Sequence, residues 1–259
     1  MIDFNKNMAS ISNNEIKKVK ALQQKKFRDE QGLFIVEGEK MVDEAVRSGL
    51  TVEKIYRTEE IGADAMSRIS ALSSPSPVLA VVRKPSDIYV VDPSVLEEKL
   101  SSGGLYLALD TIRDPGNLGT ILRIADWFGA DAVFATHDTV DVFNPKVVQA
   151  TMGAIFRVKM HYVDLPELSR MVLDKGGSIF GTFLDGENMY GKQLDNGSEK
   201  PSMIVIGNES NGISDSMAGL VTDRLYIPPY PAGQSGSESL NAAIATAITV
   251  AEFRRRLYR

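Results

Sequence analysis

An arginine stands less than two turns into a helical pattern that opens with a polar, glycine-rich loop. The stretch LDTIRDPGNLGTILRIADWFGA, residues 109–130, carries it, and Arg123 lies off the apolar stripe of the helix. Cations are disfavoured near a helix N-terminus, because the unpaired backbone N–H groups make that end positive. A guanidinium beside bare N–H donors is nevertheless suited to bind a phosphate or another anion. The alternative is a surface ion pair of Arg123 with Asp114 or Asp126.

The loop before this helix supplies further polar groups. Gly116 and Gly119 leave the backbone bare beside the arginine, and Asn117 is placed to cap the helix. A second loop, GNESNGIS at 207–214, follows an apolar run and carries Glu209 between two glycines. A glycine directly after a strand lets a ligand approach the backbone closely, although Asn-Gly is also typical of a plain turn.

A third polar segment precedes the last helical pattern. IPPYPAGQSGSESLNAAIATAITVAEF, residues 227–253, begins with an extended, proline-rich lead-in. Ser239 or Asn241 then begins a helix that is apolar nearly all round, and we expect this helix to be buried. The two polar side chains either only cap a core helix or also face a site.

Alternating apolar runs and helical patterns must position these loops. The runs are LYLAL (105–109), DAVFA (131–135), IFRVKM (155–160), SIFGTF (178–183), SMIVI (202–206) and RLYI (224–227). Continuous apolar runs are typical of a buried parallel sheet, and the alternation predicts an α/β layered fold. Because ligands bind at the carboxyl ends of such strands, we expect the loops that follow them to form a site.

The first hundred residues look like a separate small α/β module. We expect a basic helix at about 13–26, a strand at 33–36, a helix from about 37–39, and strands at 54–56 and 78–82. The segment 93–104 ends in SSGG, and the best domain boundary divides the chain into 1–100 and 101–259. KKVKALQQKKFR, residues 17–28, has six basic residues and no acid, and is either a solvated helix face or an RNA-contacting patch.

Bulk composition excludes several classes of protein. The chain has 259 residues, no cysteine, two histidines and a net charge of −5, so disulfides are excluded and a metal site is not expected. No stretch approaches the ~18 apolar residues of a membrane span, and the N-terminus has no apolar signal segment. The sequence lacks a dinucleotide-binding fingerprint, a phosphate-binding P-loop and a nucleophile elbow. We expect a cytoplasmic protein.

The three loops together resemble the SpoU (TrmH-like) family of RNA 2′-O-ribose methyltransferases, which belong to the SPOUT class. D-P-x-N-x-G…R, G-N-E-x-x-G and I-P…S-L-N all occur in register, at 114–123, 207–212 and 227–241. The resemblance implies a mostly parallel-sheet α/β methyltransferase domain with a trefoil knot, an exception to un-knotted chains. It also implies S-adenosylmethionine as the cofactor, no metal, a homodimer through the knot helices, and a small N-terminal α/β RNA-binding domain.

The resemblance also assigns site residues. The chemically active side chains it implies are Arg123, Asn117, Glu209, Ser239 and Asn241. Those implied to hold the cofactor, mainly through backbone, are Leu184, Gly207, Asn208, Gly212, Ile227, Pro228 and Leu240. The implied substrate is ribosomal or transfer RNA, and ribosomal RNA is favoured because the N-terminal domain resembles a ribosomal-protein fold.

The sequence departs from the family pattern in one place. From Ile227 to Ser239 it is longer than the family's usual spacing, so the path of the loop around 231–238 is not implied by the resemblance. Two other functions stay open at this point. The protein could be a SPOUT-class methyltransferase that acts on a base nitrogen, or an RNA-binding protein that has lost catalysis.

Overall fold

The computed structural model describes residues 11–88, 92–194, 199–231 and 239–258, and the chain forms two compact units. Unit 1 comprises Met1–Ser86 together with Asp141–Arg157, and unit 2 comprises Asp87–Val140 and Val158–Arg259. A segment from the middle of the sequence therefore packs with the N-terminal part. The division into domains at 1–100 and 101–259 stays a prediction.

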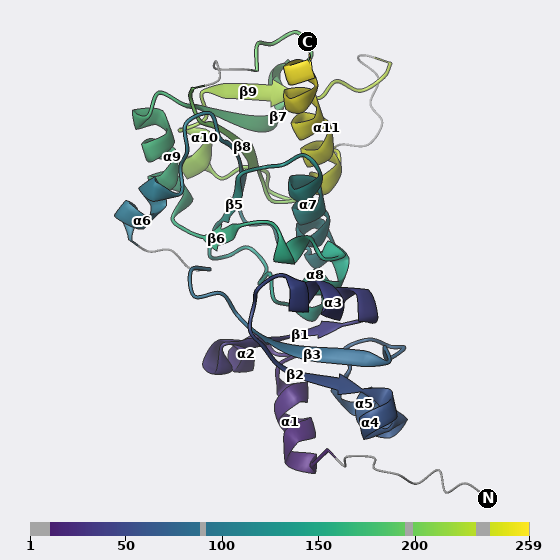
Figure 1. The fold of residues 1–259 in the computed structure, drawn as a ribbon. Coiled ribbons are helices and arrows are strands. Elements are labelled where there is room, and N and C mark those ends of the chain that lie inside the picture. The colour runs from purple at the N-terminus through teal and green to yellow at the C-terminus, as the bar shows by residue number, and fades with distance from the viewer. Residues whose placement is uncertain (1–10, 89–91, 195–198, 232–238, 259) are drawn as a thin grey trace, which may run out of the picture. The chain divides into compact units, whose positions relative to one another are not determined.

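Unit 1 is a three-stranded antiparallel sheet with helices packed against it (Figure 1). The strand order is β1 (Leu33–Glu37), β3 (Val78–Arg83), β2 (Val52–Arg57). Its helices are α1 (Asn13–Ala21), α2 (Lys25–Gln31), α3 (Glu39–Arg47), α4 (Thr58–Ile61), α5 (Ala63–Ile69), α8 (Pro145–Thr151) and the short 3-10 helix η1 (Ala154–Phe156). Leu22, Ile35, Met66, Ile69 and Leu79 form the centre of its core.

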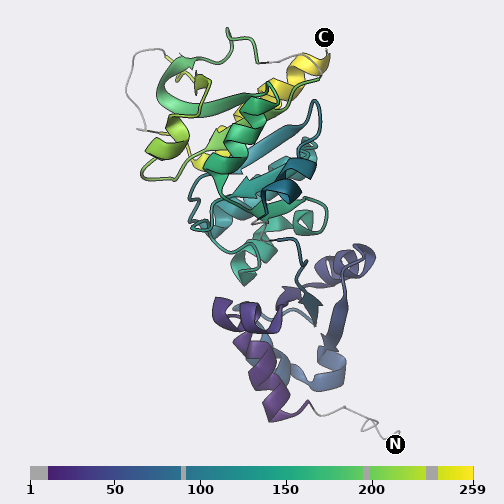
Figure 2. The ribbon, with the colours of Figure 1, turned by 90° about the vertical axis from the view of Figure 1, so that its left-hand side faces the viewer.

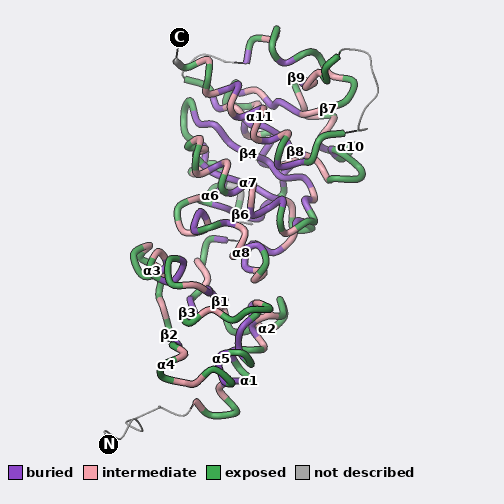
Figure 3. Tube along the Cα trace, turned by 90° about the vertical axis from the view of Figure 1, so that its right-hand side faces the viewer, coloured by how far each residue is buried: buried purple, intermediate pink, exposed green. Residues whose placement is uncertain are grey.

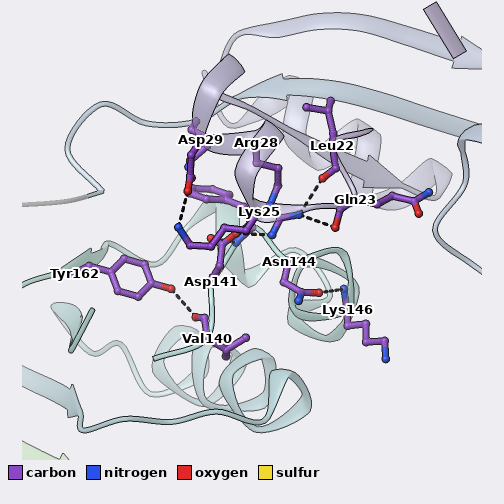
Figure 4. A network of polar contacts seen from close by, with 12 residues as sticks. Leu22, Gln23, Lys25, Arg28, Asp29, Val140, Asp141, Asn144, Lys146 and Tyr162 are labelled. Carbon is purple, nitrogen blue, oxygen red and sulfur yellow. Dashed lines mark hydrogen bonds and ion pairs between the residues drawn. The ribbon is translucent and has the colours of Figure 1, made fainter. Parts of the chain in front are cut away.

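A buried arginine explains why the predicted helix at 13–26 is two helices. The Arg28 guanidinium donates to the carbonyls of Leu22 and Gln23, each at 2.9 Å, and so satisfies acceptors just beyond the end of α1 (Figure 4). The same guanidinium pairs with Asp141 at 2.6 Å, and both side chains are almost fully buried. Arg28 is therefore a structural residue of unit 1, and the basic stretch at 17–28 loses one member of any surface patch.

Unit 2 contains a six-stranded sheet in which every neighbouring pair is parallel. The order is β6 (Met160–Tyr162), β5 (Ala132–Ala135), β4 (Leu105–Leu109), β8 (Ser202–Ile206), β7 (Ser178–Asn188), β9 (Asp223–Tyr226). β4, in the middle, is buried along its whole length, as its continuous apolar sequence predicts (Figure 3).

Helices cover both faces of this sheet. α7 (Pro115–Trp127) and α11 (Ala242–Arg255) pack together on one face, and α11 continues into η2 (Arg256–Tyr258). On the other face lie α6 (Pro93–Glu98), α9 (Leu165–Asp174) and α10 (Asp215–Ala218). Figure 2 shows α11, in yellow, against the strands, where its Phe253 ring meets Phe180 edge-on with 4.8 Å between centroids.

Two sequence expectations about the second half of the chain are corrected. The run 155–160 is not a strand: residues 154–156 form η1, and β6 begins only at Met160. Gly153, in the left-handed conformation, allows the tight turn into η1 in unit 1. The last helix is also not wholly buried, because Ile244 on α11 keeps 51% of its surface exposed.

Within the described residues, no helix is long and apolar enough to cross a membrane.

Candidate active site

The predicted loops meet at one edge of the sheet in unit 2. β4 and β8 run in register, so Leu109 pairs with Ile206 and both strands end at the same level. The backbone N–H of Asp110 still donates to the Ile206 carbonyl at 2.9 Å. The loops after these strands, 110–114 and 207–214, therefore start side by side, at the edge where parallel sheets bind ligands.

Asp114, rather than Asn117, caps helix α7. Its side chain accepts a hydrogen bond from the backbone N–H of Asn117 at 2.8 Å, and Pro115 occupies the first helical turn. The expectation that Asn117 caps the helix is thus wrong. The Asn117 side chain is buried and contacts other loops instead.

Glu209 accepts a hydrogen bond from the side-chain amide of Asn117. Asn117 Nδ2 donates to Glu209 Oε1 at 2.9 Å, and the backbone N–H groups of Asp114 and Arg113 donate to the same carboxylate at 3.3 and 3.4 Å. Partial burial raises the pKa of Glu209, but these hydrogen bonds outweigh it and hold the pKa below its ordinary value. Glu209 is therefore an ionised acceptor at neutral pH.

Asn241 completes a chain of side-chain hydrogen bonds across the three motifs. Its Oδ1 caps α11 by accepting from the backbone N–H groups of Ala243 and Ile244 at 2.9 and 3.3 Å. Its Nδ2 must then be the donor, and it donates to Asn117 Oδ1 at 2.8 Å. This fixes the Asn117 amide with Nδ2 toward Glu209, so each amide orientation follows from its neighbour.

The backbone of the second motif is closely packed and bare. Gly207 and Gly212 cross so tightly that a Cβ on Gly207 would collide with the backbone of Gly212, and Asn208 and Gly212 exchange backbone hydrogen bonds at 2.8 and 2.9 Å. Asn208 Nδ2 also donates to the Thr111 carbonyl at 2.7 Å. A ligand at this edge would meet main chain rather than side chains.

Apolar side chains stand exposed beside this edge. Leu184, in β7 beyond its pairing with β8, keeps 71% of its surface exposed, and Leu240, next to Asn241, keeps 48%. Ile227 and Pro228 follow the end of β9 and are half-buried. Bare backbone with apolar neighbours fits a ligand that combines a flat apolar ring with polar edges, such as an adenosine group.

Arg123 and Ser239 are not part of the hydrogen-bond chain. Both are exposed, and neither side chain has a hydrogen bond or ion pair with another described residue. The alternative in which Arg123 pairs with Asp114 or Asp126 is therefore not what the structure holds. An exposed guanidinium on α7 is available to a bound anion, whereas Asn117, Glu209 and Asn241 are committed to one another.

Sequence reasoning overlooked two residues that shape the first loop. Asp110 is buried and its Oδ2 accepts from the backbone N–H of Ser214 at 2.7 Å, tying the second loop to β4. Thr111 has φ of 62°, a conformation that costs a β-branched residue ~1–3 kcal/mol. An acid directly after a fully apolar strand was the sequence signal for Asp110. No sequence pattern indicated the conformation of Thr111.

The longer loop at 232–238 lies outside the described residues.

Family models match both parts of the chain. Residues 104–251 match the SpoU rRNA Methylase family, and residues 13–98 match the MRM3-like substrate binding domain. The first of these matches contains all three motifs, at 114–123, 207–212 and 227–241.

Individual proteins match over nearly the whole chain. The chain is 33% identical to the 23S rRNA (guanosine(2553)-2′-O)-methyltransferase RlmP of Bacillus subtilis, covering 96% of this chain and 99% of that one. It is 26% identical to the human mitochondrial rRNA methyltransferase 3, over 89% and 69% of the two chains. The structure of an AdoMet-bound rRNA methyltransferase from Sinorhizobium meliloti matches with a TM-score of 0.83 and 30% identity, over 97% and 98%.

Proposed function

The chain belongs to the SpoU rRNA methylase family, and on that premise we propose that it transfers a methyl group from S-adenosylmethionine to a ribose 2′-hydroxyl of RNA. The observation that carries this proposal is the Asn241–Asn117–Glu209 chain of hydrogen bonds. It joins the three motifs at the edge of the sheet where β4 and β8 end. Rigid alignment of reacting groups is worth ~7–11 kcal/mol in such transfers.

The cofactor site is the bare backbone at this edge. S-adenosylmethionine, when bound, supplies a methyl group activated by an adjacent sulfonium. Gly207, Asn208 and Gly212 would hold it through main chain, with Leu184, Ile227, Pro228 and Leu240 around it. A Cβ on Gly207 would collide with the backbone of Gly212 and Ile213, so this path of the loop requires glycine at 207.

Arg123 is the residue that we assign to the RNA. Its guanidinium is exposed and has no partner among the described residues, so it can bind a phosphate with its two-pronged fork and orient the neighbouring ribose. A role as the base that removes the 2′-hydroxyl proton is disfavoured. A guanidinium stays protonated in proteins and has no lone pair that can accept a proton.

Glu209 is also a poor base, because its carboxylate is occupied by donors and its pKa is lowered. We assign Asn117, Glu209 and Asn241 to positioning the loops, and Ser239 to the substrate side of the site. The proton of the 2′-hydroxyl then leaves to water.

The substrate that we favour is ribosomal RNA. Residues 13–98 match a substrate binding domain, and the relatives matched over most of the chain carry rRNA methyltransferase names. Unit 1 supplies Lys17, Lys18 and Lys20 on α1, which are exposed and suited to contact phosphates without reading the bases. We place the protein in the cytoplasm, and we expect the trefoil knot of the family in unit 2.

We further propose that the protein is a homodimer. Trp127 on α7 keeps 85% of its surface exposed, and Ile244 on the adjacent α11 keeps 51%. Large exposed apolar side chains on packed helices are typical of protein interfaces. Light scattering should give twice the chain mass for the wild type and one chain mass for Trp127→Glu. The control Val46→Glu, at an exposed apolar position in unit 1, should stay dimeric; a monomeric wild type would refute the dimer.

The activity is tested by supplying S-adenosylmethionine with a radioactive methyl group and unmodified bacterial ribosomal RNA. Label should enter the RNA with the wild type and not with Arg123→Ala. Cofactor binding is measured separately by calorimetry. Absence of both cofactor binding and transfer would favour the non-catalytic RNA-binding protein.

A further inference from the structure

One arginine outside the three motifs holds the segment of β7 that carries Leu184. β7 and β9 pair in register up to Thr182, which lies opposite Leu225. Glu187 also pairs with Leu225, so the four residues 183–186 make an excursion between two attachments to the same position of β9. At its far end Gly186 passes so close to β9 that a Cβ there would meet the Leu225 backbone.

Arg224 contacts two residues of this excursion at once. Its guanidinium carbon lies 3.5 Å from the centroid of the Phe183 ring, a stacked cation–π contact. Its Nη2 donates to Asp185 Oδ1 at 2.6 Å. Arg224 itself sits on β9 directly opposite Gly181 of β7.

Gly181 makes this stack possible. A Cβ on Gly181 would come within 2.5 Å of the Phe183 ring, so the ring occupies the space that a side chain would need. Phe183 also packs against the core of unit 2. One face of the excursion is thus anchored to the core and to Arg224 together.

The alternation of an extended chain then determines where Leu184 points. Successive side chains of a strand point to opposite sides, so Phe183 and Asp185 share the side of Arg224 and Leu184 takes the other. Leu184 is accordingly exposed. The contacts of its two sequence neighbours, Phe183 and Asp185, thus keep the Leu184 side chain exposed at the ligand-binding edge of the sheet.

We propose that Arg224 is a positioning residue for the cofactor: by stacking on Phe183 and pairing with Asp185 it fixes the 183–186 excursion, so that Leu184 can cover the flat adenine face of S-adenosylmethionine. This inference rests on the proposed function. It predicts a defect in cofactor binding that is separate from RNA binding and from the chemical step.

The test measures cofactor affinity by calorimetry in the full-length protein. Arg224→Met keeps the length of the side chain but removes both contacts, and should raise the Kd for S-adenosylmethionine about tenfold. Arg224→Lys keeps the charge facing Asp185 without the flat stack and should fall between. The control Arg83→Met breaks an exposed ion pair with Glu53 in unit 1 and should leave the Kd unchanged.

Four further readouts separate a positioning role from general damage to the fold. The turnover of Arg224→Met at saturating cofactor, its KM for RNA and its melting temperature should match the wild type, while hydrogen exchange at 183–186 becomes faster. A Kd within twofold of the wild type would overturn the inference and leave the proposed function intact. Equal losses in cofactor affinity, turnover and melting temperature would also overturn it. A wild type that neither binds the cofactor nor methylates RNA would refute the proposed function itself.

Discussion

The side-chain amide of Asn241, at the N-terminus of α11, donates a 2.8 Å hydrogen bond to the amide oxygen of Asn117 in α7. The two residues are 124 positions apart in the sequence. Because Asn241 is oriented by the helix that it caps, the direction of the Asn117 amide, and thus its bond to Glu209, is set by the N-terminus of α11. Asn117, in the first motif, therefore contacts one residue of each of the other two motifs.

Removing the Asn117 amide should therefore disturb the site more than the fold. Asn117→Ala leaves Asn241 Nδ2 and Glu209 without their partner, and we expect a loss of ~1–3 kcal/mol in unfolding free energy and about a hundredfold loss in kcat/KM. Urea unfolding and methyl transfer measure the two effects. Asn211→Ala, in the same loop as Glu209 but with an exposed side chain, is the matched control. Activity of Asn117→Ala within threefold of the wild type would contradict the positioning role.

The lowered pKa of Glu209 predicts how its contribution varies with pH. A carboxylate whose pKa is lower in the folded state stabilises the protein above the ordinary value of 4.5, and loses this contribution as pH falls through the folded pKa. Glu209 is largely exposed, so solvent screening weakens this contribution. We expect the free energy of unfolding of Glu209→Gln to lie about 1 kcal/mol below that of the wild type at pH 7. Unfolding free energies at pH 7, 5 and 3 should show this difference closing toward low pH. A difference in unfolding free energy that widens in acid would contradict this prediction. The control is Glu98→Gln, at an exposed acid on α6, which should unfold with the same free energy as the wild type.

The buried pair in unit 1 should dominate the stability of that unit. Arg28→Met leaves the Asp141 carboxylate buried and unpaired, which should cost ~3–5 kcal/mol. Changing both residues, to Met at 28 and Leu at 141, should recover most of the loss, because no charge is then left unpaired. Urea unfolding checks this, with Lys26→Met as the control at an exposed pair. A double variant no more stable than Arg28→Met would contradict this explanation.

The guanidinium fork of Arg123 is tested by the conservative change. Arg123→Lys keeps the charge but cannot bind a phosphate through two parallel hydrogen bonds, so we expect turnover to fall about 10- to 100-fold. Stability should change by less than ~0.5 kcal/mol, because the side chain is exposed and has no hydrogen bond or ion pair with another described residue. Arg170→Lys, exposed on α9, is the control. Near-normal turnover of Arg123→Lys would rule out the fork.

The strands around the site were predictable because their apolar runs are nearly continuous and almost wholly buried. β4 and β8 have the predicted bounds, and the ends of these strands bring the first two motif loops together. The cap of α7 could also have been predicted, because an aspartate followed by a proline is a usual beginning of a helix. The expectation that Asn117 caps α7 did not take the pair Asp114 and Pro115 into account.

Other features depend on packing that no local pattern carries. The run 155–160 has the composition of a strand, yet Ile155 and Phe156 lie in a 3-10 turn of unit 1. The basic stretch 17–28 looks uniformly exposed, but Arg28 is buried against Asp141. No local pattern indicates this pair, because the two residues are 113 positions apart. The contact between Arg224 and Phe183 likewise depends on the pairing of β7 with β9.

The most direct measurement concerns the atom that receives the methyl group. RNA labelled by the protein from S-adenosylmethionine would be digested with alkali, which needs a free 2′-hydroxyl to cleave the chain. A ribose methylated at this oxygen resists cleavage, so we expect label in dinucleotides for the wild type. Label in mononucleotides would show that a base is the target and would contradict the account.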